Sequence, residues 1–230
     1  MKPEEVRALY DRPYAAAYEA KFLESEITTE GAQYELSLLR SFLTPQSKWL
    51  DAACGTGYFL RRFPEIDRVG LDISPAMIER AQAANPGIDV VQHDFRRPIP
   101  QWRDRFDLVS CMWYAYSLVD TVDELSQVIG NFADWTSPGG RCFMPLSDPS
   151  LIAGVQLPYR KTSPYGKLSI TGILWCFYEE DGTKVHRHLV APNVEFIVEQ
   201  FEVFFEKVDV IRYPGNDPRP AIIASHKRHA

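Results

Sequence analysis

The spacing of apolar residues changes near residue 46 of the 230-residue chain. Before that point apolar side chains recur three or four positions apart, as they do on one face of a helix. The stretch from residue 3 to about residue 43 therefore predicts three helices. In the second of them Tyr14, Tyr18 and Phe22 form a single stripe. We expect residues 1–45 to form an N-terminal helical cap on the rest of the chain.

Beyond residue 46 short apolar runs alternate with stretches of helical spacing. The expected strands are residues 48–51, 68–72, 90–92, 106–112 and 141–146, and the expected helices are 58–63, 75–84 and 122–135. A tight turn at 137–140 should lead into the fifth strand. Alternation of this kind predicts an α/β domain, in which helices cover both faces of a mostly parallel sheet. Residues 46–147 are its expected core.

Residues 148–191 break the alternation and predict a small antiparallel insertion after the fifth strand. Two β-rich runs, 168–178 and 183–190, flank Glu179-Glu180-Asp181-Gly182, which has the composition of a hairpin turn. The insertion could be a lid or a homodimer interface, because β-rich edges can pair with a second copy. His186 and His188 alternate along the second run and so share a face; they could form a base or metal pair, but we expect that face to be the solvated one.

Residues 192–230 should complete the single domain. A helix is expected from residue 194 to about residue 206, followed by strands at 208–213 and 221–225.

Composition excludes several classes of partner. The net charge is −6, whereas a nucleic-acid-binding protein needs a concentrated basic face, so we expect no nucleic acid. No apolar run reaches membrane length and the N-terminal residues are charged, which predicts no membrane segment and a cytoplasmic protein. The four cysteines have neither disulfide nor zinc spacing, and no other ligand grouping predicts a metal.

Three features follow the ends of successive predicted strands, the edge at which open α/β sheets bind ligands. The glycine-containing loop 53–57 comes after the first strand, where its backbone can approach a ligand closely. Asp72 ends the second strand, within reach of a ribose diol. Asp94 follows the third strand, and with the flat ring of Phe95 it suits an adenine. Each feature has a structural reading when taken alone, but their order and placement favour a nucleoside-containing cofactor.

A dinucleotide-binding domain competes for the same features. Its fingerprint requires a third glycine for close helix packing, and this chain has Leu60 there, a bulky residue expected in the core. Asp51, just before the loop, fits a cofactor without phosphates, because its carboxylate can assist an amino-acid ammonium group. A nicotinamide-dependent oxidoreductase is therefore the weaker alternative.

These motifs resemble those of class I S-adenosylmethionine-dependent methyltransferases. The resemblance is carried by the stretches 50–57, 69–77 and 106–109, by Asp94, and by Pro138-Gly139-Gly140. It implies a Rossmann-like seven-stranded sheet whose last strand is antiparallel. It also implies that Asp72 binds the ribose hydroxyls, and that Asp94 and the Phe95 amide read the adenine edge. The full cofactor-binding set is expected to be Tyr14, Asp51, Ala53, Gly55, Gly57, Asp72, Ile73, Met77, Asp94, Phe95 and Met112, with Ile73 and Met77 against the adenine.

Within that family the chain is most similar to small-molecule enzymes of the aminosugar N-methyltransferase type. The shared start is Tyr10-Asp11-Arg12-Pro13-Tyr14, and the resemblance implies that Tyr14 contacts the cofactor carboxylate. Those enzymes also carry an antiparallel insertion after strand five. The chain departs from them at Ser117-Leu118, where they place a histidine that serves as a base.

Aromatic residues after the fourth strand are the candidates for the acceptor side. We expect Trp113, Tyr114 and Tyr116, together with Tyr14, to position the reactants rather than to act as a base; the alternative is that some of them only pack beneath the lid. The sequence thus predicts methyl transfer from S-adenosylmethionine to an amine or hydroxyl of a small sugar or secondary metabolite, with S-adenosylhomocysteine as product. A non-catalytic cofactor-binding partner or sensor protein is the main alternative.

Overall fold

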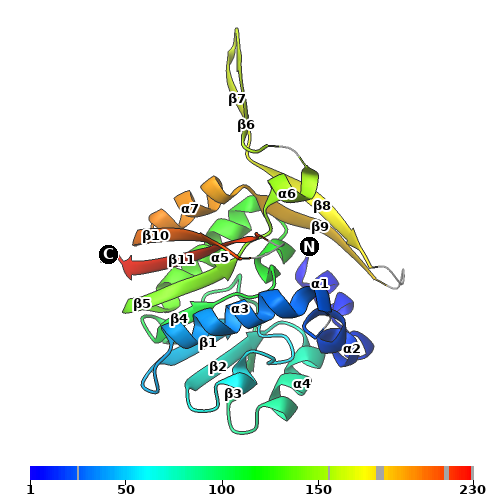
Figure 1. Ribbon diagram of the computed structural model, residues 1–230, viewed down its shortest axis with the longest axis vertical. Helices are drawn as coiled ribbons and strands as arrows, with labels where there is room; N and C mark the ends of the chain where they lie inside the picture. Colours follow the sequence, from blue (N-terminus) through cyan, green and yellow to red (C-terminus); the bar gives the residue numbers. More distant parts are fainter. Residues whose placement is uncertain (25, 155, 180–183, 215–217, 229–230) are drawn as a thin grey trace.

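A seven-stranded sheet forms the centre of the molecule (Figure 1). The computed structural model describes residues 1–24, 26–154, 156–179, 184–214 and 218–228. The strands lie in the order β10-β11-β5-β4-β1-β2-β3. Their bounds are β1 Lys48–Ala52, β2 Asp67–Asp72, β3 Asp89–Gln92, β4 Phe106–Ser110, β5 Thr136–Pro145, β10 Phe205–Arg212 and β11 Pro220–Lys227. β11 runs antiparallel to both its neighbours and the other pairs are parallel, so the predicted fold is confirmed.

The helices begin at the caps that the sequence provides. They are α1 Pro3–Leu9, α2 Arg12–Phe22, α3 Glu26–Phe42, α4 Pro75–Ala84, α5 Val122–Trp135, the short α6 Pro149–Ala153 and α7 Val194–Glu202. The side chain of Asp11 accepts a hydrogen bond from the Tyr14 amide and starts α2, and Ser74 starts α4 in the same way. Pro75 occupies the first position of α4, where a missing amide hydrogen costs nothing. No helix among the described residues is both long and apolar enough to cross a membrane.

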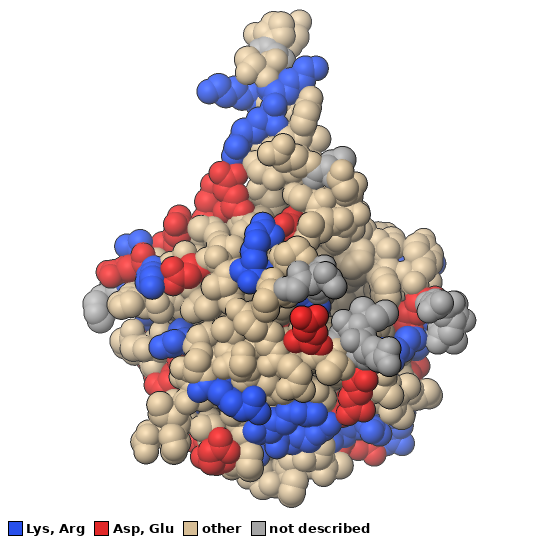
Figure 2. Space-filling model, viewed as in Figure 1, with Lys and Arg blue, Asp and Glu red and all other residues tan. Residues whose placement is uncertain are grey.

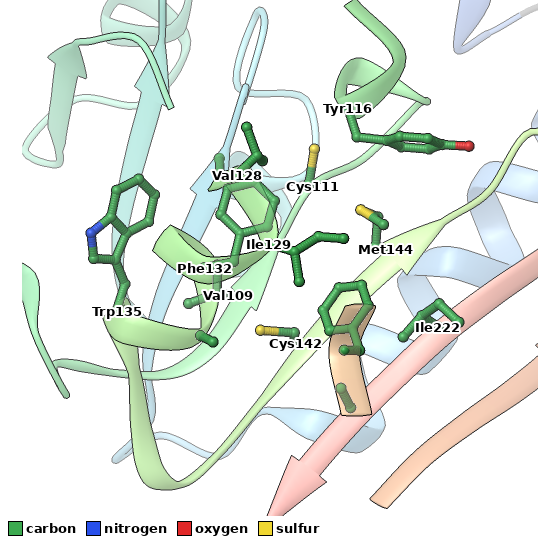
Figure 3. Close-up of a cluster of buried hydrophobic side chains, with 14 of the residues drawn as sticks. Val109, Cys111, Tyr116, Val128, Ile129, Phe132, Trp135, Cys142, Met144 and Ile222 are labelled. Atoms are coloured by element: carbon green, nitrogen blue, oxygen red, sulfur yellow. The ribbon is translucent and has the colours of Figure 1, made fainter. Parts of the chain in front are cut away.

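Two apolar clusters cover the two faces of the sheet. α5 and α7 pack on one face, in a cluster that includes Leu50 and Val109 (Figure 3). α3 and the segment after β1 pack on the other, in a cluster that includes Trp49 and Leu108. Neighbouring residues of a strand therefore enter opposite clusters, as the two-residue period of a strand requires. The rigid sheet between them fixes the positions of its strand ends.

Three predicted elements of the core have different bounds in the structure. Residues 58–63 form turns and the 3-10 helix Leu60–Arg62 rather than an α-helix, because the interval from Gly57 to Pro64 is little longer than one helical turn. The expected turn 137–140 lies inside β5, where the pairing with β4 shifts register. Thr136 pairs with Phe106, and the next pair joins Arg141 to Leu108. The last helix ends at Glu202, since Phe205 is fully buried in β10.

The insertion contains two hairpins where one was expected. β6 (Tyr159–Ser163) pairs with β7 (Gly166–Ile170), and β8 (Gly172–Tyr178) pairs with β9 (Val185–Pro192). The run 168–178 is therefore divided between them at Gly172, where an added Cβ would lie 2.8 Å from the Pro192 Cα. The expected turn at 179–182 lies mostly outside the described residues.

The two hairpins differ in their surroundings. β8 and β9 lie against the body of the molecule, whereas β6 and β7 project from it (Figure 1). The projecting pair carries three basic residues, Arg160, Lys161 and Lys167, seen as blue side chains on the arm in Figure 2. Only the β8–β9 hairpin is in a position to contribute to a site on the body.

Candidate functional site

A cavity lies between the N-terminal helices and the carboxyl ends of β1, β2 and β4. Its empty volume is about 800 Å³ including the space open to solvent, which is in the range of roughly 300–1,000 Å³ common for small-molecule sites. Nine of the eleven predicted cofactor residues line it: Asp51, Ala53, Gly55, Asp72, Ile73, Met77, Asp94, Phe95 and Met112. Tyr14 and Gly57 do not. We refer to this space as the first cavity.

The loop after β1 turns through left-handed backbone conformations. Ala53, Gly55 and Gly57 have φ angles of 65°, 55° and 73°. An added Cβ at Gly55 would meet open space, but one at Gly57 would lie 2.4 Å from the Asn85 Nδ2, which donates a hydrogen bond to the Gly57 carbonyl. Gly57 thus does not line the cavity, and the absence of a Cβ lets it pack closely against the end of α4.

Asp72 holds the loop and the start of α4 together. Its Oδ2 accepts a hydrogen bond from the Gly55 amide at 2.9 Å, and its Oδ1 accepts one from the Ser74 amide at 2.8 Å. Burial raises the pKa of Asp72 to about 6, against the opposing effect of these backbone hydrogen bonds. The carboxylate is therefore buried, oriented by two amides, and part of the cavity lining.

Asp51 is buried at the end of a polar chain within the sheet. The Trp49 indole donates to the Ser110 hydroxyl at 2.9 Å, and that hydroxyl donates to the Asp51 Oδ1 at 2.7 Å. The other oxygen, Oδ2, is buried and has no hydrogen-bond partner among the described residues. Burial first, and then the nearby Asp72, raise the pKa of Asp51 to about 7. A cation in the cavity would therefore stabilise the charged form of this carboxyl group.

Asp94 and Phe95 line the same cavity from the far side. The Asp94 Oδ1 accepts hydrogen bonds from the Arg96 backbone amide at 3.1 Å and from its Nε at 2.8 Å. The Phe95 carbonyl accepts one from the Asn131 Nδ2 at 2.9 Å. The segment after β3 is thus held in place by Arg96, which also lines the cavity, and by Asn131 of α5.

A second cavity adjoins the first and is lined mainly by aromatic rings. The two share Tyr10, Tyr18, Trp113 and Leu118 as lining residues. Its other rings come from α2, from the segment after β4 and from the β8–β9 hairpin: Tyr14, Phe22, Tyr114, Trp175, Phe177 and His186. Trp113 and Tyr114 have left-handed φ angles of 53° and 60°, which are costly for bulky residues and turn this segment sharply after β4.

Tyr116 lies outside both cavities. Its side chain is fully buried among Cys111, Val128 and Met144, and its hydroxyl oxygen accepts a hydrogen bond from the Ser147 amide at 2.8 Å (Figure 3). The structure therefore does not bring Tyr116 together with Trp113 and Tyr114 at the second cavity. The 3-10 helix Ala115–Leu118 turns this ring into the core, away from Trp113 and Tyr114.

Comparison with known proteins gives a domain family for this geometry. Residues 50–140 match the family model described as a methyltransferase domain. A dTDP-4-amino-2,3,4,6-tetradeoxy-D-glucose N,N-dimethyltransferase from Saccharopolyspora spinosa is 35% identical over 112 residues, which are 46% of this chain and 42% of that protein. The alignment thus spans less than half the length of this curated relative.

Solved structures extend the likeness to nearly the whole chain. A sugar N-methyltransferase from a Streptoalloteichus species has a TM-score of 0.66 and 17% identity, and the match covers 94% of this chain and 93% of that one. An amino pentose methyltransferase from Micromonospora echinaspora, solved with bound S-adenosylmethionine, has a TM-score of 0.63 and 19% identity, with 94% and 98% covered. At these identities the likeness establishes the fold.

Residues 50–140 thus match a methyltransferase domain, and nearly the whole chain shares its fold with solved methyltransferases. These findings agree with the family resemblance, the enzyme class and the cofactor that the motifs predict. The nicotinamide reading is not supported, and Leu60 is fully buried as its size suggested.

Tyr14 of α2 lines the second cavity, with its hydroxyl group directed at the β8–β9 hairpin. It donates a hydrogen bond to the Glu179 Oε1 at 2.5 Å and lies 3.1 Å from the His186 Nε2. The His186 Nε2 is itself 2.9 Å from the same Glu179 oxygen, and Lys21 of α2 forms an ion pair with the other. We name Tyr14, Lys21, Glu179 and His186 the hairpin cluster.

The hairpin cluster overturns the expectation for the two histidines. Only 7% of the His186 surface is exposed, whereas His188 is exposed and has a left-handed φ of 56°. The pairing of β8 with β9 shifts register between Trp175 and Phe177, so the two-residue alternation fails across the pair. The two side chains therefore do not share a solvated face.

Lys21, Glu179 and the second-cavity rings of the hairpin were not among the predicted site residues. Glu179 was read as part of a turn, although it follows the last residue of β8. The sequence did contain one signal. Glu179 and His186 are seven residues apart, so a short turn between them would bring their side chains together. Among the described residues no group of three or more His, Cys, Asp or Glu side chains is placed to hold a metal ion.

Proposed function

We propose that the chain transfers a methyl group from S-adenosylmethionine to an amino nitrogen of a small sugar or secondary metabolite, leaving S-adenosylhomocysteine. The observation that carries this proposal is the aromatic second cavity, which adjoins the first through four shared residues. A cofactor in the first cavity and an acceptor in the second would meet at this boundary.

Methyl transfer from a sulfonium is an in-line displacement, so the protein must align the acceptor with the methyl group and exclude water. Tyr10, Tyr18 and Trp113 at the boundary suit both needs, since they are large and mainly apolar. Aromatic faces also attract a sulfonium or ammonium cation by roughly 0.5–2 kcal/mol.

The roles of the cofactor residues are part of the proposal. Asp72 would bind the ribose hydroxyls, Asp51 would face the ammonium end, and Ile73 and Met77 would flank the adenine beside Asp94. Their presence around one cavity supports this assignment, and the unpartnered Asp51 Oδ2 offers an acceptor for a cationic group. Tyr14 is not assigned to the cofactor, since its hydroxyl group is bonded to Glu179.

An amine acceptor is favoured over a hydroxyl by the relatives. The curated relative is named for N,N-dimethylation of an amino sugar, and the Streptoalloteichus protein is named as a sugar N-methyltransferase. A hydroxyl nucleophile also needs more help from a base than a neutral amine does.

Paired acceptors provide the test. Binding of S-adenosylmethionine is first measured by isothermal titration, and release of S-adenosylhomocysteine is then followed with amino deoxysugars and with the matched hydroxyl sugars. Turnover of the amino member alone is expected. Turnover confined to hydroxyl sugars would refute the acceptor assignment, and cofactor binding with no turnover on any acceptor would favour the non-catalytic binding protein.

Two further parts of the proposal concern the whole protein. The projecting β6–β7 hairpin, with Tyr159, Leu168 and Ile170 about half exposed, would form a homodimer contact. Light scattering should show a dimer for the native protein and a monomer for the variant Leu168→Glu.

We also place the protein in the cytoplasm, where its four free cysteines would stay reduced.

A further inference from the structure

His186 belongs to the wall of the second cavity although it comes from an insertion outside the methyltransferase core. It lies on β9, and the rings of Tyr10, Tyr14 and Phe177 surround it at centroid separations of 6.2, 6.1 and 5.5 Å. A histidine that is this deeply buried normally has a fixed partner. Here that partner is the carboxylate of Glu179.

The contact with Glu179 decides which nitrogen of the imidazole carries its hydrogen. Burial raises the pKa of the Glu179 carboxyl group, but hydrogen bonds from Lys21, Tyr14 and His186 outweigh burial and hold that pKa below its usual range. Glu179 is therefore an acceptor, and its Oε1 lies 2.9 Å from the His186 Nε2. Neutral His186 is then protonated on Nε2, which leaves a lone pair on Nδ1.

This is the arrangement in which a carboxylate orients a histidine as a base. Lys21 forms an ion pair with the second Glu179 oxygen, so the charge of the carboxylate is partly balanced and its position is fixed from α2. Among the described residues, Tyr10 and Tyr18 act electrostatically on Tyr14 of the cluster, and Lys184, which pairs with Asp11, lies 5.7 Å from the Tyr14 ring.

We propose that His186, oriented by Glu179, is the catalytic base that takes the proton from the acceptor amine. The segment after β4 has only Ser117 and Leu118 where a base was sought. In this proposal the hairpin supplies the base instead. The inference rests on the proposed function, since it supposes an amine in the second cavity.

The proton balance is simple. An alkylamine is largely protonated at neutral pH and has no lone pair for attack. Nδ1 of His186 takes one proton from the ammonium group, and the neutral nitrogen then attacks the methyl carbon as the bond from carbon to sulfur breaks. The products are S-adenosylhomocysteine and a methylated ammonium group. The imidazolium beside Glu179 returns its proton to water before the next turnover.

The test compares the pH dependence of kcat in the native enzyme and in His186→Asn. A missing base lowers kcat by about 100-fold at about pH 7. The ratio of native to variant kcat should fall to less than about 10-fold by about pH 9.5, because more of the amine is then already deprotonated in water. The affinity for S-adenosylmethionine, measured by titration, should change less than twofold, since His186 does not line the first cavity.

His188→Asn is the matched control, because this exposed histidine lies on the same strand. It should leave kcat and its pH dependence unchanged. If His186→Asn does not fold, as judged by thermal melting, Glu179→Gln decides instead: it keeps the shape of the side chain and should show a smaller loss that also narrows with rising pH. A loss that is constant with pH, or smaller than about threefold at neutral pH, would overturn the role of His186. A native enzyme that turns over no amine would instead overturn the proposed function.

Discussion

The two cavities of this protein are built in different ways. The first lies at the ends of neighbouring parallel strands, and its three carboxylates lie within residues 51–94, where backbone amides orient Asp72 and Asp94 and the Ser110 hydroxyl orients Asp51. The second is assembled from α2, from the segment after β4 and from a hairpin more than 150 residues beyond α2. The cofactor side is thus a local construction, whereas the acceptor side depends on contacts between distant segments.

This difference teaches where variation is tolerated. A change in the loop after β1 alters a demanding backbone, because Ala53, Gly55 and Gly57 there have left-handed conformations. A change in the hairpin alters only which side chains face the second cavity. Substitutions on the two sides should therefore have different effects.

Replacing Asp72 by alanine should abolish most cofactor binding. The variant loses the carboxylate that orients the Gly55 and Ser74 amides and that we assign to the ribose. Because hydrogen bonds to a charged group contribute roughly 1.5–3 kcal/mol each, the affinity for S-adenosylmethionine should fall by about 100-fold or more in titration calorimetry. Asp89→Ala, in an exposed position at the start of β3, should bind as the native protein does. Equal affinities would remove Asp72 from the cofactor site.

Two glycines of the same loop should differ in their effect on stability. Gly57→Ala adds a Cβ 2.4 Å from the Asn85 Nδ2 at a left-handed φ, so the free energy of unfolding should fall by about 3 kcal/mol in denaturant titration. Gly55→Ala meets open space and should lose only about 1 kcal/mol, from the left-handed backbone. It should instead weaken cofactor binding, because Gly55 lines the first cavity. The reverse order of stabilities would contradict the described packing.

The cofactor affinity should rise with pH. Burial raises the pKa of Asp51 to about 7 and that of Asp72 to about 6, whereas carboxyl groups of an unfolded chain titrate near about 4. Between about pH 4 and about pH 7 the free folded protein therefore holds more protons than the unfolded chain, and these two groups make it less stable as the pH rises. A bound cation favours the charged carboxylates, so we expect about tenfold tighter binding at about pH 7.5 than at about pH 5.5.

Asp51→Asn tests separately how the Asp51 charge affects the stability of the free protein and the affinity for the cofactor. The amide cannot ionise, so the free variant should be more stable than the native protein above about pH 7 and its cofactor affinity should vary much less with pH. Thermal melts and titrations at both pH values provide the measurement. A native affinity that does not change with pH would show that no cationic group of the cofactor lies near Asp51.

The smallest effect is expected on the acceptor side. The Trp175 Nε1 is buried without a hydrogen-bond partner among the described residues, and Trp175 lines the second cavity. Trp175→Phe removes this donor and should raise the KM for the acceptor about fivefold, equivalent to about 1 kcal/mol, with an unchanged affinity for the cofactor. Leu174→Ala, on the same strand but 67% exposed, serves as control. A weakened cofactor affinity in Trp175→Phe would show that the two cavities are not separate in function.

The same division explains what could be predicted from the sequence. The sheet, the loop after β1, Asp72 and α4 are fixed by local signals: a glycine turn, an acidic strand end, and Ser74-Pro75 at a helix start. These signals placed nine cofactor candidates around one cavity. Gly57 was misplaced because sequence shows that a glycine is needed but not which neighbour requires it.

The acceptor side could not be predicted to the same degree. The direction of Tyr116 depends on the tight segment after Trp113 and Tyr114, whose left-handed backbone is unusual for aromatic residues. The burial of His186 depends on a register shift in the hairpin and on Lys21 and Tyr14 from α2. Contacts of this kind join residues more than 150 positions apart, and no periodicity within either segment reports them.

The hairpin cluster also has a kinetic consequence. α2 contributes Tyr18 to the boundary of both cavities, and it is tied to the β8–β9 hairpin by the Lys21–Glu179 and Lys184–Asp11 ion pairs. Swinging the hairpin outwards must break both pairs or carry α2 along. Because Tyr18 lines both cavities, such a movement would open both in one step.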